Sequence, residues 1–185
     1  MEIEKLRQSY DLTVDWKPFF LRPETPPEGM PLPAYIVEKM KDPNEPLKLR
    51  AAREGLKMVR GDRIPSTRRA HEAAEFARAH GKLEPLHAAL LKRYWELGQD
   101  LYSMDVLRGA ATDAGLDPDA LQTALENGTY KSAVEQGVQE ARELGIRAVP
   151  TFVFNDAFGI QGAEEQPAFL EAMRRLGATP IRKDH

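Results

Sequence analysis

The first twenty residues combine two hydrophobic patterns. Ile3, Leu6 and Tyr10 recur at three- and four-residue spacing, which predicts the end of an amphipathic helix. Residues 12–21 alternate apolar and polar side chains and are rich in β-branched and aromatic types. That alternation predicts a strand with Pro18 near its edge or end. The chain is therefore expected to open with a helix followed by a strand.

The middle of the chain, residues 34–145, has a helical pattern almost throughout. It follows an expected extended connector, residues 22–33, whose five prolines leave no room for a regular element. Ser66 is placed to cap one helix, and Asp117 followed by Pro118 is a second helix start. Five glycines stand where a left-handed residue ends a helix: Gly81, Gly98, Gly115, Gly128 and Gly145. These stops predict a helical subdomain.

The last part of the chain returns to strands. Residues 146–155 predict a short strand after a proline turn, and residues 157–161 its hairpin partner, with a tight turn at Asn155 and Asp156. Residues 166–176 predict a final helix stopped by Gly177. Its apolar face is formed by Phe169, Leu170, Met173 and Leu176.

Composition narrows the class of protein. The 185 residues are 42% hydrophobic and 30% charged, the composition of an ordinary globular protein. Their number suits one domain, or one domain that carries a large insertion. The net charge of −3 provides no positive field for a phosphate backbone, so no nucleic-acid partner is expected. The amino-terminal residues contain no apolar leader, and no stretch is long enough to span a bilayer. We therefore expect a cytoplasmic protein without a membrane partner.

The absence of cysteine removes several chemistries. A chain with no cysteine has no disulfide, no thiolate metal ligand and no cysteine nucleophile. The segment from His71 begins like a zinc-protease helix, but Glu75 replaces the second histidine and no third ligand follows. We expect no metal site there, only a solvated helix face.

Two segments carry a resemblance to a known family. The run Ala148-Val149-Pro150-Thr151-Phe152, ahead of a strand, hairpin and helix, resembles the Val-Pro-Thr motif of thioredoxin-fold proteins, in which the proline bond is cis. Residues 14–21 with their connector, and the run from Arg68 to Gly145, resemble the cytoplasmic DsbA relatives called FrnE-like, close to the 2-hydroxychromene-2-carboxylate isomerases. The resemblance implies an α/β thioredoxin-like fold, with a core of residues 1–33 and 146–178 and an all-helical insertion of residues 34–145.

One departure from this family concerns its active site. The family begins with a strand that leads into a Cys-x-x-Cys turn, at the start of the helix whose tail corresponds to residues 1–10. This chain starts inside that helix. We therefore expect a thioredoxin-like fold that is incomplete at the amino terminus, a natural product that begins upstream of Met1, and no catalytic residue within these 185.

The resemblance also implies binding residues. Val149, Pro150 and Thr151 are expected to bind a peptide or small ligand, with the backbone of Val149 pairing with an extended substrate. The alternative is that Pro150 only shapes the turn. Ser66 and Thr67 stand where relatives often have Asn-Thr facing the substrate cleft, although helix capping also explains Ser66. Four arginines could meet an anion such as a glutathione carboxylate or simply lie on the surface: Arg60, Arg63, Arg68 and Arg69.

Three functions remain open at this point. The first is a relative of thiol–disulfide oxidoreductases of the protein disulfide isomerase type that is redox-inactive as written. The second is a glutathione-dependent isomerase or transferase, with glutathione as co-substrate and no other cofactor. The third is a non-catalytic module that binds a peptide or assembles as a homodimer through an open sheet edge.

Overall fold

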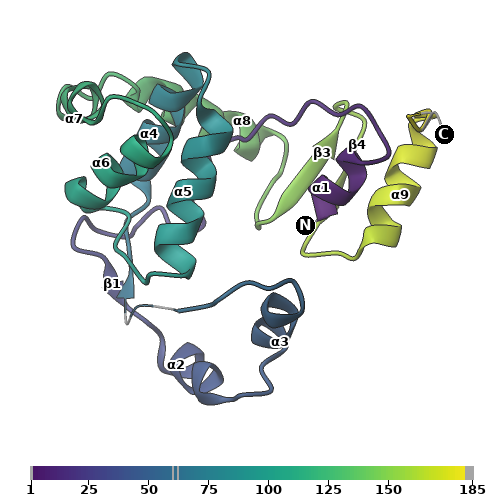
Figure 1. The fold of residues 1–185 in the computed structure, drawn as a ribbon, viewed down its shortest axis with the longest axis horizontal. Helices are drawn as coiled ribbons and strands as arrows, with labels where there is room; N and C mark the ends of the chain where they lie inside the picture. The colour runs from purple at the N-terminus through teal and green to yellow at the C-terminus, as the bar shows by residue number, and fades with distance from the viewer. Residues whose placement is uncertain (1, 60, 62, 182–185) are drawn as a thin grey trace. The chain divides into compact units, whose positions relative to one another are not determined.

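The computed structural model describes residues 2–59, 61 and 63–181, and Figure 1 shows their arrangement. The helices are α1 (Glu2–Arg7), α2 (Ala34–Lys41), α3 (Pro46–Arg53), α4 (Arg68–Ala79), α5 (Leu83–Trp95), α6 (Met104–Asp113), α7 (Pro118–Glu126), α8 (Lys131–Glu143) and α9 (Gln166–Arg175). The strands are β1 (Met30–Pro31), β2 (Arg63–Ile64), β3 (Thr151–Phe154) and β4 (Phe158–Gln161). None of these helices is long and apolar enough to cross a membrane.

The chain forms two compact units. The first contains the residues up to Leu21 and those from Gln139 onward, and we call it the hairpin unit. The second spans Arg22–Val138, and we call it the helical unit. The domain limits expected from the sequence, at residues 33/34 and 145/146, stay a prediction.

The hairpin unit is built on the predicted β3–β4 hairpin. The two strands pair antiparallel, with Thr151 opposite Gln161 and Phe154 opposite Phe158. Asn155 and Asp156 connect them with φ values of 47° and 54°. Two left-handed residues in succession match the twist of a tight hairpin turn, and Asn and Asp tolerate that conformation better than most side chains. The hairpin prediction is confirmed.

One face of this hairpin carries the core of the unit. Leu6 of α1 and Phe169 and Met173 of α9 are buried, and Phe152 and Phe154 of β3 pack against them. Figure 1 shows α1 and α9 beside the hairpin. The two strands and the two helices thus share one small apolar core.

The strand predicted at residues 12–21 is not formed. The segment is extended, and exposed and partly buried residues alternate from Asp11 to Lys17, but it has no ladder of hydrogen bonds. A strand needs a neighbour at hydrogen-bonding distance. The part of the chain that the structure describes supplies none, because β3 and β4 pair only with each other.

The helical unit packs α4, α5, α6 and α7 around an apolar core. Its fully buried leucines are Leu86, Leu107 and Leu121. The predicted helix stops are confirmed, since Gly81, Gly98, Gly115, Gly128 and Gly145 have φ values between 62° and 73°. The predicted cap at Asp117 is also confirmed, because its carboxylate accepts hydrogen bonds from the amides of Asp119 and Ala120.

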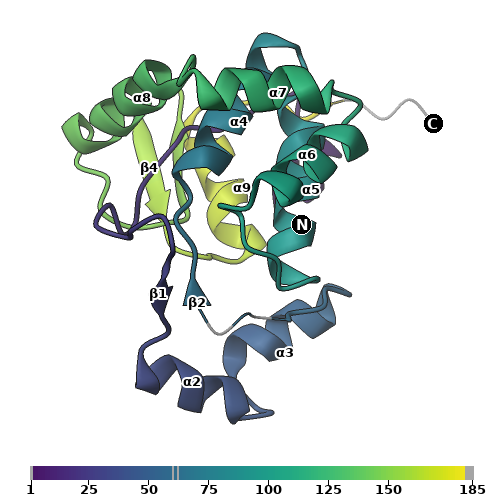
Figure 2. The same ribbon diagram turned by 90° about the vertical axis from the view of Figure 1, so that its left-hand side faces the viewer.

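Two predictions within the helical unit are wrong. Ser66 does not cap α4, because Thr67 occupies the N-cap position and no side chain makes a capping hydrogen bond there. The connector does contain a regular element, since Met30 pairs with Ile64 and Pro31 with Arg63. Figure 2 shows these two strands side by side, with α2 and α3 in the stretch of chain that connects them. A ladder of two residues, closed from distant parts of the sequence, leaves no local pattern to detect.

Candidate binding sites

The loop before β3 holds the first group of candidate residues. The Val149–Pro150 peptide bond is cis. The Pro150 carbonyl accepts a hydrogen bond from the Gly162 amide at 2.8 Å, and the Thr151 hydroxyl donates to the Ala148 carbonyl at 2.7 Å. Val149 makes no backbone hydrogen bond within the described residues, and its side chain is 50% exposed. The loop therefore fixes its neighbours and leaves the Val149 backbone available.

The register of the hairpin determines which backbone groups of β3 are paired. Pro150 is bonded to Gly162, and Phe152 stands opposite Ile160 two residues further along. In an antiparallel pair, alternate residues direct both their N–H and C=O groups to the same neighbour. Phe152 and Phe154 therefore pair with β4, while the backbone groups of Thr151 and Val153 point the other way. We call these two residues, together with Val149 just before the strand, the open edge of β3.

The side chains along the open edge are accessible as well. Phe152 and Phe154 face the core, so the side chains at the alternate positions face away from it. Val153 is 44% exposed and Thr151 is partly buried. A row of free backbone groups flanked by exposed valines can accept a further extended segment.

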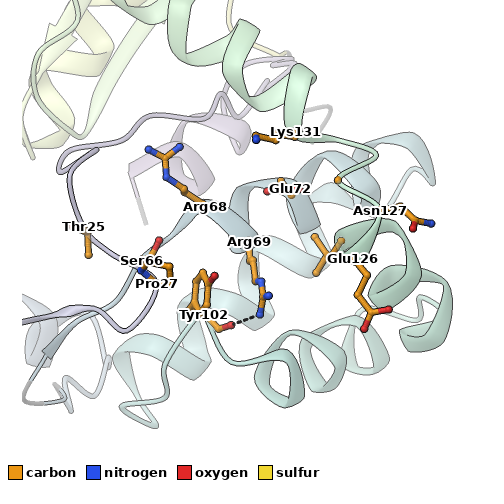
Figure 3. A pocket seen from close by; sticks show the side chains of 12 residues that line it. Thr25, Pro27, Ser66, Arg68, Arg69, Glu72, Tyr102, Glu126, Asn127 and Lys131 are labelled. Atoms are coloured by element: carbon orange, nitrogen blue, oxygen red, sulfur yellow. Dashed lines mark hydrogen bonds between the residues drawn. The ribbon is translucent and has the colours of Figure 1, made fainter.

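Ser66 belongs to a different region, in the helical unit. It lines a pocket of about 530 Å³, which we call the Ser66 pocket. The other lining residues come from the connector, the start of α4, the loop before α6, and the junction of α7 with α8: Thr25, Pro27, Arg68, Arg69, Glu72, Tyr102, Leu125, Glu126, Asn127, Gly128 and Lys131. Figure 3 shows the positions of these side chains. Thr67, at the N-cap of α4, is adjacent in sequence but does not line the pocket.

The Ser66 pocket contains several charged groups. The Arg69 guanidinium lies over the Tyr102 ring, 4.4 Å from its centroid. Burial raises the pKa of the Glu72 carboxyl above its ordinary value, while the positive charges of Lys131, Arg69 and Arg68 act to lower it. Glu72 is partly buried, so the expectation of a solvated helix face is wrong for this residue. The main electrostatic feature of the pocket is that the Glu72 carboxyl lies near three positive charges, those of Arg68, Arg69 and Lys131.

The four arginines considered as an anion site are only partly brought together. Arg68 and Arg69 line the Ser66 pocket, whereas Arg63 donates to the backbone carbonyls of Glu28 and Gly29 and has a structural role. Arg60 lies outside the described residues. The described side chains also include no group of three or more metal-ligating residues.

Of the residues that line this pocket, the sequence singles out only Ser66, Arg68 and Arg69 as possible ligand contacts. It places Glu72 in an incomplete zinc motif and gives no role to Tyr102 or Lys131. Tyr102 and Lys131 join Ser66 only through the packing of the loop before α6 and of α8. The one feature of the sequence that points to Lys131 is its positive charge, and this is weak evidence for a binding site because lysines are common on protein surfaces.

Comparison with known proteins covers most of the chain. A model of the DSBA-like thioredoxin domain matches residues 1–174. The uncharacterized protein YwbO of Bacillus subtilis is 27% identical over 179 residues, which cover 92% of this chain and 85% of the relative. A crystal structure of a probable DsbA oxidoreductase from Streptomyces coelicolor matches with a TM-score of 0.77 and 26% identity, covering 91% of this chain and 77% of the other.

A third similarity is shorter. The 2-hydroxychromene-2-carboxylate isomerase of Sphingobium xenophagum is 33% identical over 84 residues, which cover 45% of this chain and 43% of that enzyme. The family match over residues 1–174 and the structural match over most of the chain both confirm the fold class expected from the Val-Pro-Thr segment and the helical insertion. The chain belongs to the family of DSBA-like thioredoxin domains.

Proposed function

We propose that these 185 residues bind extended polypeptide segments at the open edge of β3, a function for which they need no thiol. The observation that carries the proposal is the row of backbone groups at Val149, Thr151 and Val153, which find no partner in the part of the chain that the structure describes. In the adjoining loop, the carbonyls of Ala148 and Pro150 are already bonded. An added strand gains affinity from main-chain hydrogen bonds and specificity from alternate side chains. The exposed valines favour a partner with apolar residues at every second position.

The family supports this choice of ligand class and limits the chemistry. The relatives include a probable DsbA oxidoreductase, and a chain without cysteine has no thiolate to act on a disulfide. Binding of the polypeptide is the part of such a function that these residues retain. The cytoplasmic location inferred from the sequence is part of the same proposal.

The test uses a proline on the open edge. Val153→Pro removes the Val153 amide N–H, which points away from β4 on the open edge. Proline is tolerated on an edge strand. The probe is fluorescein-labelled, reduced and carboxymethylated lactalbumin, a permanently unfolded chain, and the readout is fluorescence anisotropy. We expect the variant to bind at least about tenfold more weakly, which corresponds to about 1.4 kcal/mol.

The matched control is Val153→Ala, which keeps the amide and removes most of the side chain. It should bind within about threefold of the unsubstituted chain, because backbone pairing carries most of the affinity in an added strand. Equal binding by Val153→Pro and the unsubstituted chain would rule out the open edge. If the edge instead pairs two copies of this chain, sedimentation would show a concentration-dependent dimer that Val153→Pro dissociates.

A second candidate function is a glutathione-dependent isomerase or transferase. It is favoured by the similarity to the 2-hydroxychromene-2-carboxylate isomerase, and by the two arginines of the Ser66 pocket as partners for a carboxylate. Isothermal titration with reduced glutathione tests it. Saturable binding that Arg68→Gln weakens and Val153→Pro leaves unchanged would favour this candidate over polypeptide binding.

A further inference from the structure

The Ser66 pocket meets an uncapped helix end. α4 has twelve residues, its N-cap Thr67 makes no side-chain capping bond, and the first backbone bond of the helix runs from the His71 amide to the Thr67 carbonyl. The amides of Arg69 and Ala70 make no backbone hydrogen bond within the described residues. These two amides and the helix dipole together favour a negative charge at this end.

The Ser66 hydroxyl is an independent indication of a ligand. The residue is only 2% exposed, it lines the pocket, and its side chain makes no hydrogen bond within the described part of the chain. Figure 3 shows it on the same side of the pocket as Thr25 and Arg68. Buried hydroxyl groups in folded proteins are nearly always paired, with protein, water or ligand. An acceptor atom in the pocket would satisfy this one.

The charged side chains have the right sign for such an acceptor. Arg69 is held by its contact with the Tyr102 ring and by a 3.5 Å hydrogen bond to the Tyr102 carbonyl. Arg68 lines the same pocket and donates a hydrogen bond to the Pro23 carbonyl at 3.0 Å. Lys131 adds a third positive charge at the start of α8. Two carboxylates line the pocket, and one of them, Glu126, is exposed and accepts a hydrogen bond from Gln122.

We propose that the Ser66 pocket binds a small anion that carries a carboxylate or an oxyanion group such as sulfate or phosphate. The anion accepts hydrogen bonds from the amides of Arg69 and Ala70 and from the Ser66 hydroxyl. The guanidinium groups of Arg68 and Arg69 and the ammonium of Lys131 neutralise its charge. This site lies wholly within the helical unit, so it stands or falls independently of polypeptide binding at the open edge of β3.

Glu72 makes this binding depend on pH. The charged groups that act on its carboxyl are Lys131 and Glu135 from α8 and Arg68 and Arg69 from its own helix. A bound anion adds negative charge beside Glu72, which raises its pKa further, so binding is accompanied by proton uptake. The affinity for the anion is therefore lowest at a pH where Glu72 is ionised in both the free and the anion-bound protein, and it rises as the pH falls.

The test is an NMR titration of the full chain at constant ionic strength. Sulfate is the probe for a series from about pH 7.5 to about pH 5 because its own charge is constant there, so any change in affinity comes from groups of the protein. Succinate at the higher pH tests the carboxylate class. We expect saturable shifts of the Arg69 and Ala70 amides and tighter sulfate binding at the lower pH. Saturation by either probe supports the site and defines its anion class, and shifts with neither would overturn it.

Variants separate this site from general attraction of anions. Ser66→Ala should weaken binding about threefold to tenfold, the worth of one hydrogen bond. Lys131→Gln should weaken it, whereas Lys92→Gln, an exposed lysine of α5 outside the pocket, should not. Glu72→Gln should tighten binding and flatten its pH dependence. Equal effects of Lys131→Gln and Lys92→Gln would show unspecific attraction and contradict the proposal, as would an unchanged pH dependence in Glu72→Gln.

Discussion

Phe169→Ala is expected to destabilise the hairpin unit by about 3–5 kcal/mol, the usual cost of removing a buried aromatic ring from a core. Phe169 is 1% exposed, and its ring meets Phe152 edge-on at a centroid distance of 4.9 Å and Phe154 at 6.4 Å. Both partners belong to β3, so the ring joins α9 to the strand that carries the candidate binding edge. Truncation leaves a cavity and removes both aromatic contacts.

Urea unfolding measures this effect, and Trp16 reports it. The chain has two tryptophans, Trp16 in the hairpin unit and Trp95 at the end of α5. The Phe169→Ala variant and the chain with Phe169 are therefore both prepared with Trp95→Phe, so that the fluorescence comes from Trp16 alone. The matched control is Leu170→Ala, the next residue of α9, whose side chain is 42% exposed. It should cost less than about 1 kcal/mol. Similar losses in the two variants would mean that Phe169 is not the centre of this core.

The purified 185-residue chain is expected to have no disulfide reductase activity at all. Exchange starts with attack by a thiolate on a disulfide sulfur, and this chain contains no cysteine. In the insulin assay with dithiothreitol, the lag before precipitation should be no shorter than that of the reductant alone. Thioredoxin at the same concentration provides the positive control.

Any shortening of the lag that scales with the concentration of this chain would contradict that expectation. A chaperone effect has the opposite direction, because binding of reduced insulin chains at the open edge of β3 delays their precipitation. The same assay therefore distinguishes catalysis, which shortens the lag, from polypeptide binding, which lengthens it or lowers the final turbidity.

Elements with strong local signals were the predictable part of the fold. The β3–β4 hairpin follows from two short apolar runs around Asn155 and Asp156, and the helix ends follow from glycines that adopt positive φ values. The cap at Asp117 needs only its own side chain and the next three residues. Such features depend on neighbours in sequence, so pattern and chemistry suffice to locate them.

Features that depend on distant partners were not predictable. The alternating residues 12–21 have the pattern of a strand, but the described chain gives them no strand to pair with. Met30 and Ile64 form a ladder although 33 residues separate them. Ser66 is a residue type that often caps helices, but α4 starts at Arg68, with Thr67 at its N-cap, and Ser66 lines a pocket instead. The sequence alone does not distinguish these two places. The open edge of β3 likewise required the register of the hairpin.

The measurement that tests the central claim most directly is amide hydrogen exchange by NMR, with and without the unfolded lactalbumin chain. In the free protein, the amides of Thr151 and Val153 should exchange quickly and those of Phe152 and Phe154 slowly, because only the latter pair with β4. Binding should slow exchange at Val149, Thr151 and Val153. Protection that appears elsewhere, while these three amides stay unprotected, would contradict binding at the open edge of β3.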